Sequence, residues 1–238
     1  MQNNDESNLV ECGDCSMNAV CQPLPTKNQS IDLSENYIQR KISVKSRSVL
    51  FTQDTPLTNI YAVSSGTFKL CQQTGDSTEN IMGLRFPGEL IGEDALFLKT
   101  YNYTAIAMGD SSVCKVSIDQ MNSCGEFVPE VQKNLIELLS RQAHVRQRNF
   151  QAYIGKKSAD SLLAAFLLNI IERNESYTGS TDIIELAINR NDIANFLGLR
   201  RETLSRVFSK FQKEQLIQVE GKKITLIEHE NLNELADL

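Results

Sequence analysis

The sequence predicts an α+β protein in which an N-terminal antiparallel β-roll precedes a long helix and a C-terminal winged helix-turn-helix. Three observations predict this fold class. Short apolar segments between residues 41 and 123 alternate with turns, an apolar heptad pattern follows Pro129, and two short helical segments flank Gly198. Regularly spaced turns favour antiparallel strands, and two short helices joined by a glycine-containing turn are typical of a helix-turn-helix.

Composition places the chain among ordinary globular proteins, with 238 residues, 41% hydrophobic and 23% charged. No apolar run approaches the roughly 18–20 residues that cross a membrane, so no membrane partner is expected. The acidic, polar start is unlike a signal peptide, which predicts a cytoplasmic chain. A net charge of −6 argues against binding nucleic acid with the whole surface but permits a local basic face.

Four parts follow from the changes in pattern along the chain. Residues 1–30 form a cysteine-rich segment, and residues 31–126 form the sensory β-roll. Residues 127–156 form a dimerisation helix, and residues 157–238 form the winged helix-turn-helix.

Three cysteines lie within ten residues near the N-terminus. Cys12, Cys15 and Cys21 have the spacing C-x2-C-x5-C in a chain with six cysteines. Clustered thiolates favour zinc, copper(I) or an iron–sulfur cluster, each of which usually takes four ligands. The missing ligand would be a histidine or one of the remaining cysteines, Cys71, Cys114 and Cys124.

The roll begins after a short helix expected over residues 31–39. Its clearest strands are residues 60–63, 67–71, 81–86 and 113–118. In the last of these, apolar residues alternate, which places the side chain of Cys114 opposite that of Val113.

Pro129 opens the long helix, because proline is favoured in a first helical turn. An apolar heptad seam runs along this helix and predicts a homodimer interface formed by Val131, Leu135, Leu138, Gln142, Val145, Asn149 and Ala152. Polar Gln142 and Asn149 weaken the seam, as a ligand-controlled switch requires. In the alternative interpretation, a helix packed only on its own roll would bury Ile136 and Leu139.

The helix breaks at residues 155–158, and Ser158 is a candidate N-cap for the next one. That helix would bury a stripe made of Leu162, Leu163, Phe166, Leu167 and Ile170. A polar loop over residues 174–180 and a short strand over 183–186 are expected to follow.

The C-terminal part contains the second informative stretch. Residues 192–197 and 200–211 are the two helices, and residues 214–225 a hairpin wing. Residues 190–223 hold eight Lys/Arg and four Asp/Glu, a local balance of +4. A basic module on an acidic protein indicates contact with DNA phosphates. The alternative is a solvated helical hairpin without a partner.

Residues 190–206 (RNDIANFLGLRRETLSR) resemble the DNA-reading signature of the CRP/FNR transcription regulators, and the order of parts resembles that family along essentially the whole chain. The N-terminal thiols, together with Ser112-Val113-Cys114, are similar to the FNR branch, in which these positions bind an oxygen-labile [4Fe–4S] cluster. The resemblance implies that Cys12, Cys15, Cys21 and Cys114 are the ligands and that Cys71 and Cys124 have no such role.

The resemblance further implies a non-enzymatic, oxygen-sensing homodimer that binds double-stranded DNA and controls genes of anaerobic metabolism. We expect an inverted repeat close to TTGAT-N4-ATCAA, read by Arg201, Glu202, Thr203, Ser205 and Arg206. Ser205 before Arg206 resembles the FNR branch, whereas Arg201 before Glu202 is CRP-like. The preferred base at the outer position of each half-site is therefore left undecided. RNA polymerase would contact exposed roll surface, with residues 75–79 as one candidate.

Residues 86–92 are similar to the cyclic-nucleotide phosphate loop of the CRP branch, but residues 99–105 lack the arginine that pairs the phosphate. No cyclic nucleotide is therefore expected. An iron–sulfur enzyme is disfavoured, since the spacing is not that of a ferredoxin and the two histidines, His144 and His229, are isolated. A regulator controlled by zinc or by thiol oxidation, and a nitric-oxide-responsive regulator using the same cluster, stay as alternatives.

Overall fold

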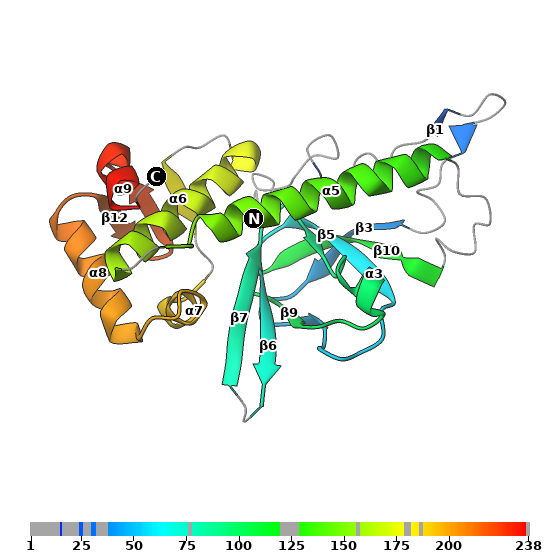
Figure 1. Cartoon of the computed structure of the whole chain (residues 1–238), viewed down its shortest axis with the longest axis horizontal. Coiled ribbons are helices and arrows are strands. Elements are labelled where there is room, and N and C mark those ends of the chain that lie inside the picture. Colours follow the sequence, from blue (N-terminus) through cyan, green and yellow to red (C-terminus); the bar gives the residue numbers. More distant parts are fainter. Residues whose placement is uncertain are drawn as a thin grey trace, which may run out of the picture. The chain divides into compact units, whose positions relative to one another are not determined.

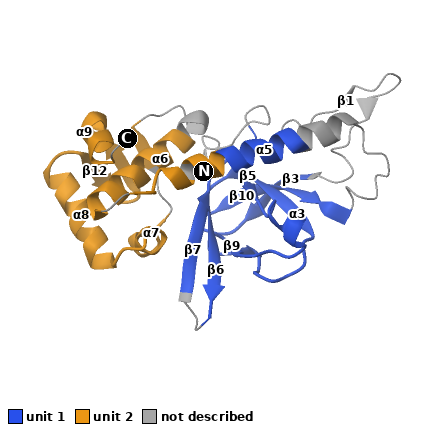
Figure 2. Ribbon diagram, in the orientation of Figure 1, with its two compact units in different colours: residues 1–144 blue, residues 145–238 orange. Residues whose placement is uncertain are grey.

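The computed structural model describes residue 15 and the ranges 24–25, 30–31, 38–75, 78–119, 129–155, 158–178, 182–185 and 188–236. The chain divides into two compact units, residues 1–144 and 145–238 (Figure 2). Helix α5 (Pro129–Gln151) starts at the predicted proline and contributes to both units. The antiparallel sheets of the first unit and the helices of the second confirm the predicted fold class.

Two four-stranded antiparallel sheets build the roll of the first unit (Figure 1). One sheet has the order β3 (Ile38–Val44), β10 (Ser111–Ser117), β5 (Asn59–Ser65) and β8 (Leu90–Ile91). The other has the order β4 (Val49–Phe51), β9 (Thr104–Ala107), β6 (Phe68–Thr74) and β7 (Thr78–Arg85). The smaller elements are β1 (Leu24–Pro25), β2 (Ser30–Ile31) and the helix α3 (Ala95–Leu98).

Aromatic side chains fill the middle of the roll. The rings of Phe51 and Tyr101 stack with their centroids 3.7 Å apart. The Tyr101 hydroxyl donates to the carbonyl of Asn59 at 2.7 Å, so the buried ring keeps its polar atom satisfied. These contacts tie β4 and β5 to the segment that leads into β9.

The short helix predicted over residues 31–39 is wrong at its described positions. Ile31 belongs to β2, and Ile38 and Gln39 open β3. Ile38 and Gln39 pair with Val116 and Lys115 of β10. Pairing with a central strand therefore decides the conformation here, because local helix propensity is a weak preference.

Backbone amides of residues 86–92, the segment similar to a nucleotide phosphate loop, are hydrogen-bonded by side chains of this chain. The Glu89 carboxylate accepts from the backbone amide of Phe86 at 3.1 Å. The Tyr103 hydroxyl accepts from the amide of Gly92 at 2.9 Å and donates to the Asp94 carboxylate at 3.1 Å. Burial, and then the nearby Asp94 carboxylate, raise the pKa of Tyr103, so the phenol stays protonated.

The second unit surrounds helix α6 (Ala159–Thr178). Its remaining elements are β11 (Ile183–Glu185), α7 (Arg190–Phe196), α8 (Arg201–Lys213), β12 (Ile217–Glu220), β13 (Lys223–Leu226) and α9 (His229–Leu235). The three strands form one antiparallel sheet in the order β11-β13-β12, which confirms the predicted wing. Four of the five predicted α6 core residues are fully buried: Leu163, Phe166, Leu167 and Ile170.

Ser158 caps α6, as predicted. Its hydroxyl accepts from the backbone amide of Ser161 at 3.0 Å, and the Ser161 hydroxyl accepts in return from the Ser158 amide at 3.3 Å. The C-terminal end of α6 differs from the prediction, because the helix continues to Thr178 where a loop over residues 174–180 was expected. Polar residues alone do not stop a helix, and this one runs to the residue before Gly179. Among the described residues, no helix combines the length and apolarity needed to cross a membrane.

Candidate nucleic-acid interface and thiol ligands

Helix α7 and the turn after it set the geometry of the candidate nucleic-acid interface. The Asn189 side chain caps α7 by accepting from the backbone amide of Asp192 at 2.9 Å. After the helix, Gly198 has a φ of +65°, and the next amide, of Leu199, donates to the carbonyl of Ala194 at 2.8 Å. A glycine suits this turn because the left-handed conformation costs it little.

One face of α8 is buried in the second unit, and this burial sets the orientation of the helix within that unit. Leu204, Val207, Phe208 and Phe211 are buried on this face. The guanidinium of Arg190, the first residue of α7, lies 4.7 Å from the centre of the Phe208 ring. The opposite face of α8 is thereby presented to solvent.

The five predicted base-reading residues lie together on the first two turns of α8. Arg201, Glu202 and Arg206 are exposed, and Thr203 and Ser205 are half-buried. The Arg206 guanidinium donates to the Thr203 hydroxyl at 3.5 Å. Among the described residues, the Glu202 carboxylate has no ion pair, so its oxygens are available to a base.

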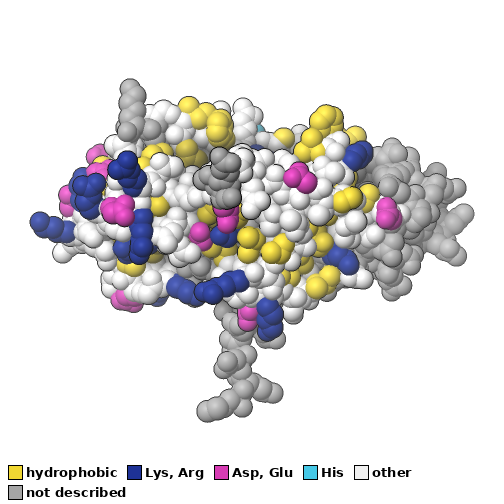
Figure 3. Space-filling model, turned by 90° about the horizontal axis from the view of Figure 1, so that it is seen from below, with side chains coloured by type: hydrophobic (Ala, Val, Ile, Leu, Met, Phe, Trp, Pro, Cys, Tyr) yellow, Lys and Arg dark blue, Asp and Glu magenta, His cyan; other side chains and the backbone are white. Residues whose placement is uncertain are grey.

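Basic side chains surround this helix. All eight Lys/Arg of residues 190–223 are exposed. In Figure 3, lysine and arginine side chains are densest over the second unit, at the left of the view. Lys222 and Lys223 lie at the turn of the β12–β13 wing. This unit therefore presents the charge that phosphate contacts require.

Two of the four predicted thiol ligands lie among the described residues. Cys15 and Cys114 are both half-buried, and Cys114 lies opposite the buried Val113 on β10, as predicted. Cys12, Cys21 and Cys124 lie outside the described residues, and within the described part no three metal-binding side chains lie together.

Cys71 differs from Cys114 in its surroundings. It lies on β6 and is 3% exposed, and its thiol is hydrogen-bonded to Glu79. A partly exposed thiol such as that of Cys114 fits a cluster ligand, whereas a thiol buried in a sheet and engaged with a carboxylate does not.

A β-bulge lies directly opposite Cys114, and no pattern in the sequence indicates it. The register of β10 with β3 passes from Val113 opposite Ile42 to Lys115 opposite Gln39. Two residues of β3 therefore lie opposite the single residue Cys114 of β10. One of the two, Lys41, has a φ of +51°. Bulges of this kind redirect side chains beside functional positions.

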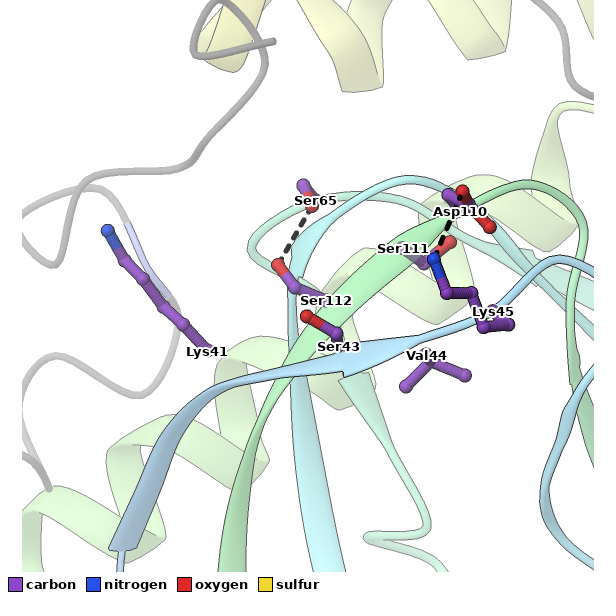
Figure 4. Close-up of a pocket in the computed structure, with 8 residues that line it drawn as sticks. All are labelled: Lys41, Ser43, Val44, Lys45, Ser65, Asp110, Ser111 and Ser112. Carbon is purple, nitrogen blue, oxygen red and sulfur yellow. Dashed lines mark hydrogen bonds and ion pairs between the residues drawn. The ribbon is translucent and has the colours of Figure 1, made fainter. Parts of the chain in front are cut away.

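Next to the bulge is a hollow of about 310 Å³ (Figure 4). Ser43, Ser65 and Ser112 are cross-strand neighbours there, and the hydroxyls of Ser65 and Ser112 lie 2.8 Å apart. Lys45 pairs with Asp110 across its rim at 3.8 Å. Ser112 shares the outward face of β10 with Cys114, so the serine-lined hollow lies on the same face of the strand as this thiol.

Two positions of the predicted dimer seam are buried by the chain itself. Leu138 and Gln142 are 6% and 7% exposed within the single chain, which favours the alternative in which this side of the helix packs on its own chain. Ile136, which the alternative interpretation buried on the roll, is 67% exposed. The side chains of Val131, Leu135 and Asn149 lie outside the described residues, and Val145 and Ala152 are half-buried.

A different stripe of α5 is exposed and has heptad spacing. It consists of Ile136, Ser140, Ala143, Gln147 and Phe150, and Ile154 continues it just beyond the helix. Phe150 and Ile154 are 68% and 57% exposed. Intervals of four and three residues are those of an interchain seam.

Two family models match the chain. The cyclic nucleotide-binding domain matches residues 41–126, and the Crp-like helix-turn-helix domain matches residues 163–235. FixK2 from Bradyrhizobium japonicum shares the fold with a TM-score of 0.70 and 22% identity, over 82% of this chain and 96% of that one.

Relatives of similar length extend the match to nearly the whole chain. The transcriptional activator protein anr of Pseudomonas aeruginosa is 34% identical over 95% of this chain and 93% of its own length. The fumarate and nitrate reduction regulatory protein of Yersinia pestis is 32% identical over 95% of this chain and 90% of its own. The chain therefore belongs to the CRP/FNR family of transcription regulators, and these relatives are regulators and not enzymes.

Proposed function

We propose that this protein is an oxygen-sensing transcription regulator of anaerobic metabolism that binds palindromic DNA as a homodimer. The observation that carries the proposal is the half-buried thiol of Cys114 on the outward face of β10, in a chain that also has the C-x2-C-x5-C triplet. The names of the relatives, which include a transcriptional activator protein, a fumarate and nitrate reduction regulatory protein and an anaerobic regulatory protein, support it.

Cys12, Cys15, Cys21 and Cys114 would hold a [4Fe–4S] cluster. When bound, such a cluster would supply an oxygen-labile connection between the N-terminal segment and β10. The chain's own part is to place one thiol on a rigid strand and three on a short segment. Loss of the connection would release that segment from the roll.

Dimerisation would use the exposed stripe of α5 rather than the seam predicted first. Ser140, Ala143 and Gln147 at its centre contribute little apolar area, whereas Ile136 and Phe150 toward the ends contribute most. Such an interface is weak enough for a difference of a few kcal/mol to control it.

Within each operator half-site, the start of α8 would read the bases. The Glu202 carboxylate would accept from cytosine N4, Arg206 would donate to guanine, and Arg201 would decide the outer position. We propose a repeat close to TTGAT-N4-ATCAA. RNA polymerase would contact the β6–β7 turn around residues 75–79, the protein would act in the cytoplasm with the DNA, and it would need no cyclic nucleotide.

Anaerobic purification tests the sensor. We expect a brown protein with about four iron atoms per chain and broad absorbance near ~400 nm that bleaches in air. Cys114→Ser should lose iron and anaerobic operator binding, whereas Cys71→Ser, which keeps a hydrogen-bond donor toward Glu79, should retain both. A colourless protein with one zinc would support the zinc-controlled alternative, and a cluster stable to air but lost with nitric oxide would support the nitric-oxide-responsive one.

A binding selection from randomised duplexes tests the reading residues separately. The parent protein should enrich the proposed repeat, and Arg201→Val should change the preferred base only at the outer position. If Arg201→Val weakens binding to all sequences equally, Arg201 contacts phosphate and reads no base.

A further inference from the structure

A lysine near the end of α8 is paired with an acid of another helix. The Lys210 ammonium lies 2.5 Å from the Asp160 carboxylate. Asp160 is in the first turn of α6, and Lys210 is in the last turns of α8. Each charge is also favoured by the end of its own helix, because helix N-termini attract anions and C-termini attract cations.

Lys210 borders the reading face. It follows Arg206 by four residues, so the two side chains are neighbours on one side of α8. Lys210 is exposed, like Arg206 and Ser209. The Lys210 ammonium donates a hydrogen bond to the Asp160 carboxylate, and this bond, followed by the charge of that carboxylate, raises the pKa of Lys210. An unpaired lysine at this position would add one phosphate contact beside the base-reading residues.

Lys213, three residues further on, provides a comparison within the same helix. It is exposed, and among the described residues its ammonium has no ion pair. The two lysines have the same chemistry and neighbouring positions, but only Lys210 has a carboxylate partner. The difference between them therefore comes from Asp160.

We propose that Asp160 is a specificity-determining residue that keeps Lys210 off the DNA backbone and so weakens binding to DNA of any sequence. Phosphate contacts add affinity without sequence information. Removing one such contact from each reading helix lowers non-specific binding and leaves the base contacts of Arg201, Glu202 and Arg206 in place. The pair thereby increases the ratio of operator binding to random binding.

The test measures the salt dependence of binding to a random-sequence duplex with the full-length protein. Asp160→Asn should steepen the slope of log K against log salt by about 0.9 for each reading helix engaged. Between about 50 and 200 mM salt, its loss of affinity should exceed that of the parent by a further three- to fourfold per helix. Glu230→Gln, which removes an exposed acid of α9, controls for the change in net charge.

Lys210→Met is the second variant and does not depend on Asp160→Asn folding well. We expect its slope to equal that of the parent, and the Asp160→Asn/Lys210→Met double variant to return to the parent slope. A flatter slope for Lys210→Met alone would mean that Lys210 already contacts phosphate, and the proposal would be wrong. It would also be wrong if Asp160→Asn matched Glu230→Gln. Random duplexes need neither the cluster nor the operator, so failure of the sensor proposal would leave this result interpretable.

Discussion

The Arg190 guanidinium lies over the ring of Phe208, 4.7 Å from its centre, and so joins the first residue of α7 to the buried face of α8. An exposed cation–π contact of this kind contributes about 0.5–1 kcal/mol. Arg190→Ala should therefore lower the free energy of unfolding by about that amount, measured by urea denaturation. Lys222→Ala in the wing turn removes a charge without such a contact and should have almost no effect.

Asn189→Ala should destabilise the second unit by about 1 kcal/mol, because it removes the side-chain acceptor of the α7 N-cap. Asn191→Ala is the matched control, since Asn191 is exposed inside the helix. Alanine is the better helix former, so the control should be neutral or slightly stabilising. Equal losses from both variants, seen by thermal melting, would show that the cap is not the cause.

The pKa of Glu79 is lowered, first by its hydrogen bond with the Cys71 thiol and then by the one with Lys69. Because the folded pKa lies below the unfolded value, this stabilisation is complete above the unfolded pKa. It is lost as pH falls through the folded pKa. Cys71→Ala and Lys69→Met should each raise the pKa of Glu79, measured by NMR titration of the carboxyl carbon. If the pKa of Glu79 stays the same in both variants, these hydrogen bonds do not contribute to the loss of stability at low pH.

Phe150→Ala should weaken the dimer at least about tenfold, because each chain loses roughly 1.5–3 kcal/mol of apolar burial at the exposed stripe. Leu138→Ala should instead lower the unfolding free energy by about 2–5 kcal/mol, because Leu138 is buried within its own chain. Sedimentation equilibrium of anaerobic protein separates the two effects. If Leu138→Ala dissociates the dimer while each chain stays folded, the dimer interface predicted from the sequence is the correct one.

Much of the fold could be predicted because its signals are local. Pro129 opens α5, Ser158 caps α6, and Gly198 makes the turn between α7 and α8. Each of these positions depends on the conformational preference of one residue and its near neighbours. The antiparallel roll followed from the spacing of the turns and from the resemblance to the family.

What could not be predicted depends on contacts between distant residues. Both stripes of α5 have heptad spacing, and only packing decides that Leu138 is buried while Ile136 is exposed. Pairing with β10 likewise gave a strand at Ile38, and the bulge opposite Cys114 appears only in the register of two strands. The Asp160–Lys210 pair joins residues fifty positions apart, a separation at which sequence patterns give no information.

The hydrogen bond between the Tyr103 hydroxyl and the Gly92 amide has a consequence for engineering this roll. An arginine introduced into residues 99–105 would supply a positive charge for a cyclic nucleotide. The Gly92 amide would still donate to the Tyr103 hydroxyl and could not donate to the nucleotide. Conversion to a second-messenger receptor would thus require at least two coordinated exchanges. One substitution alone would leave either the charge or the free amide missing.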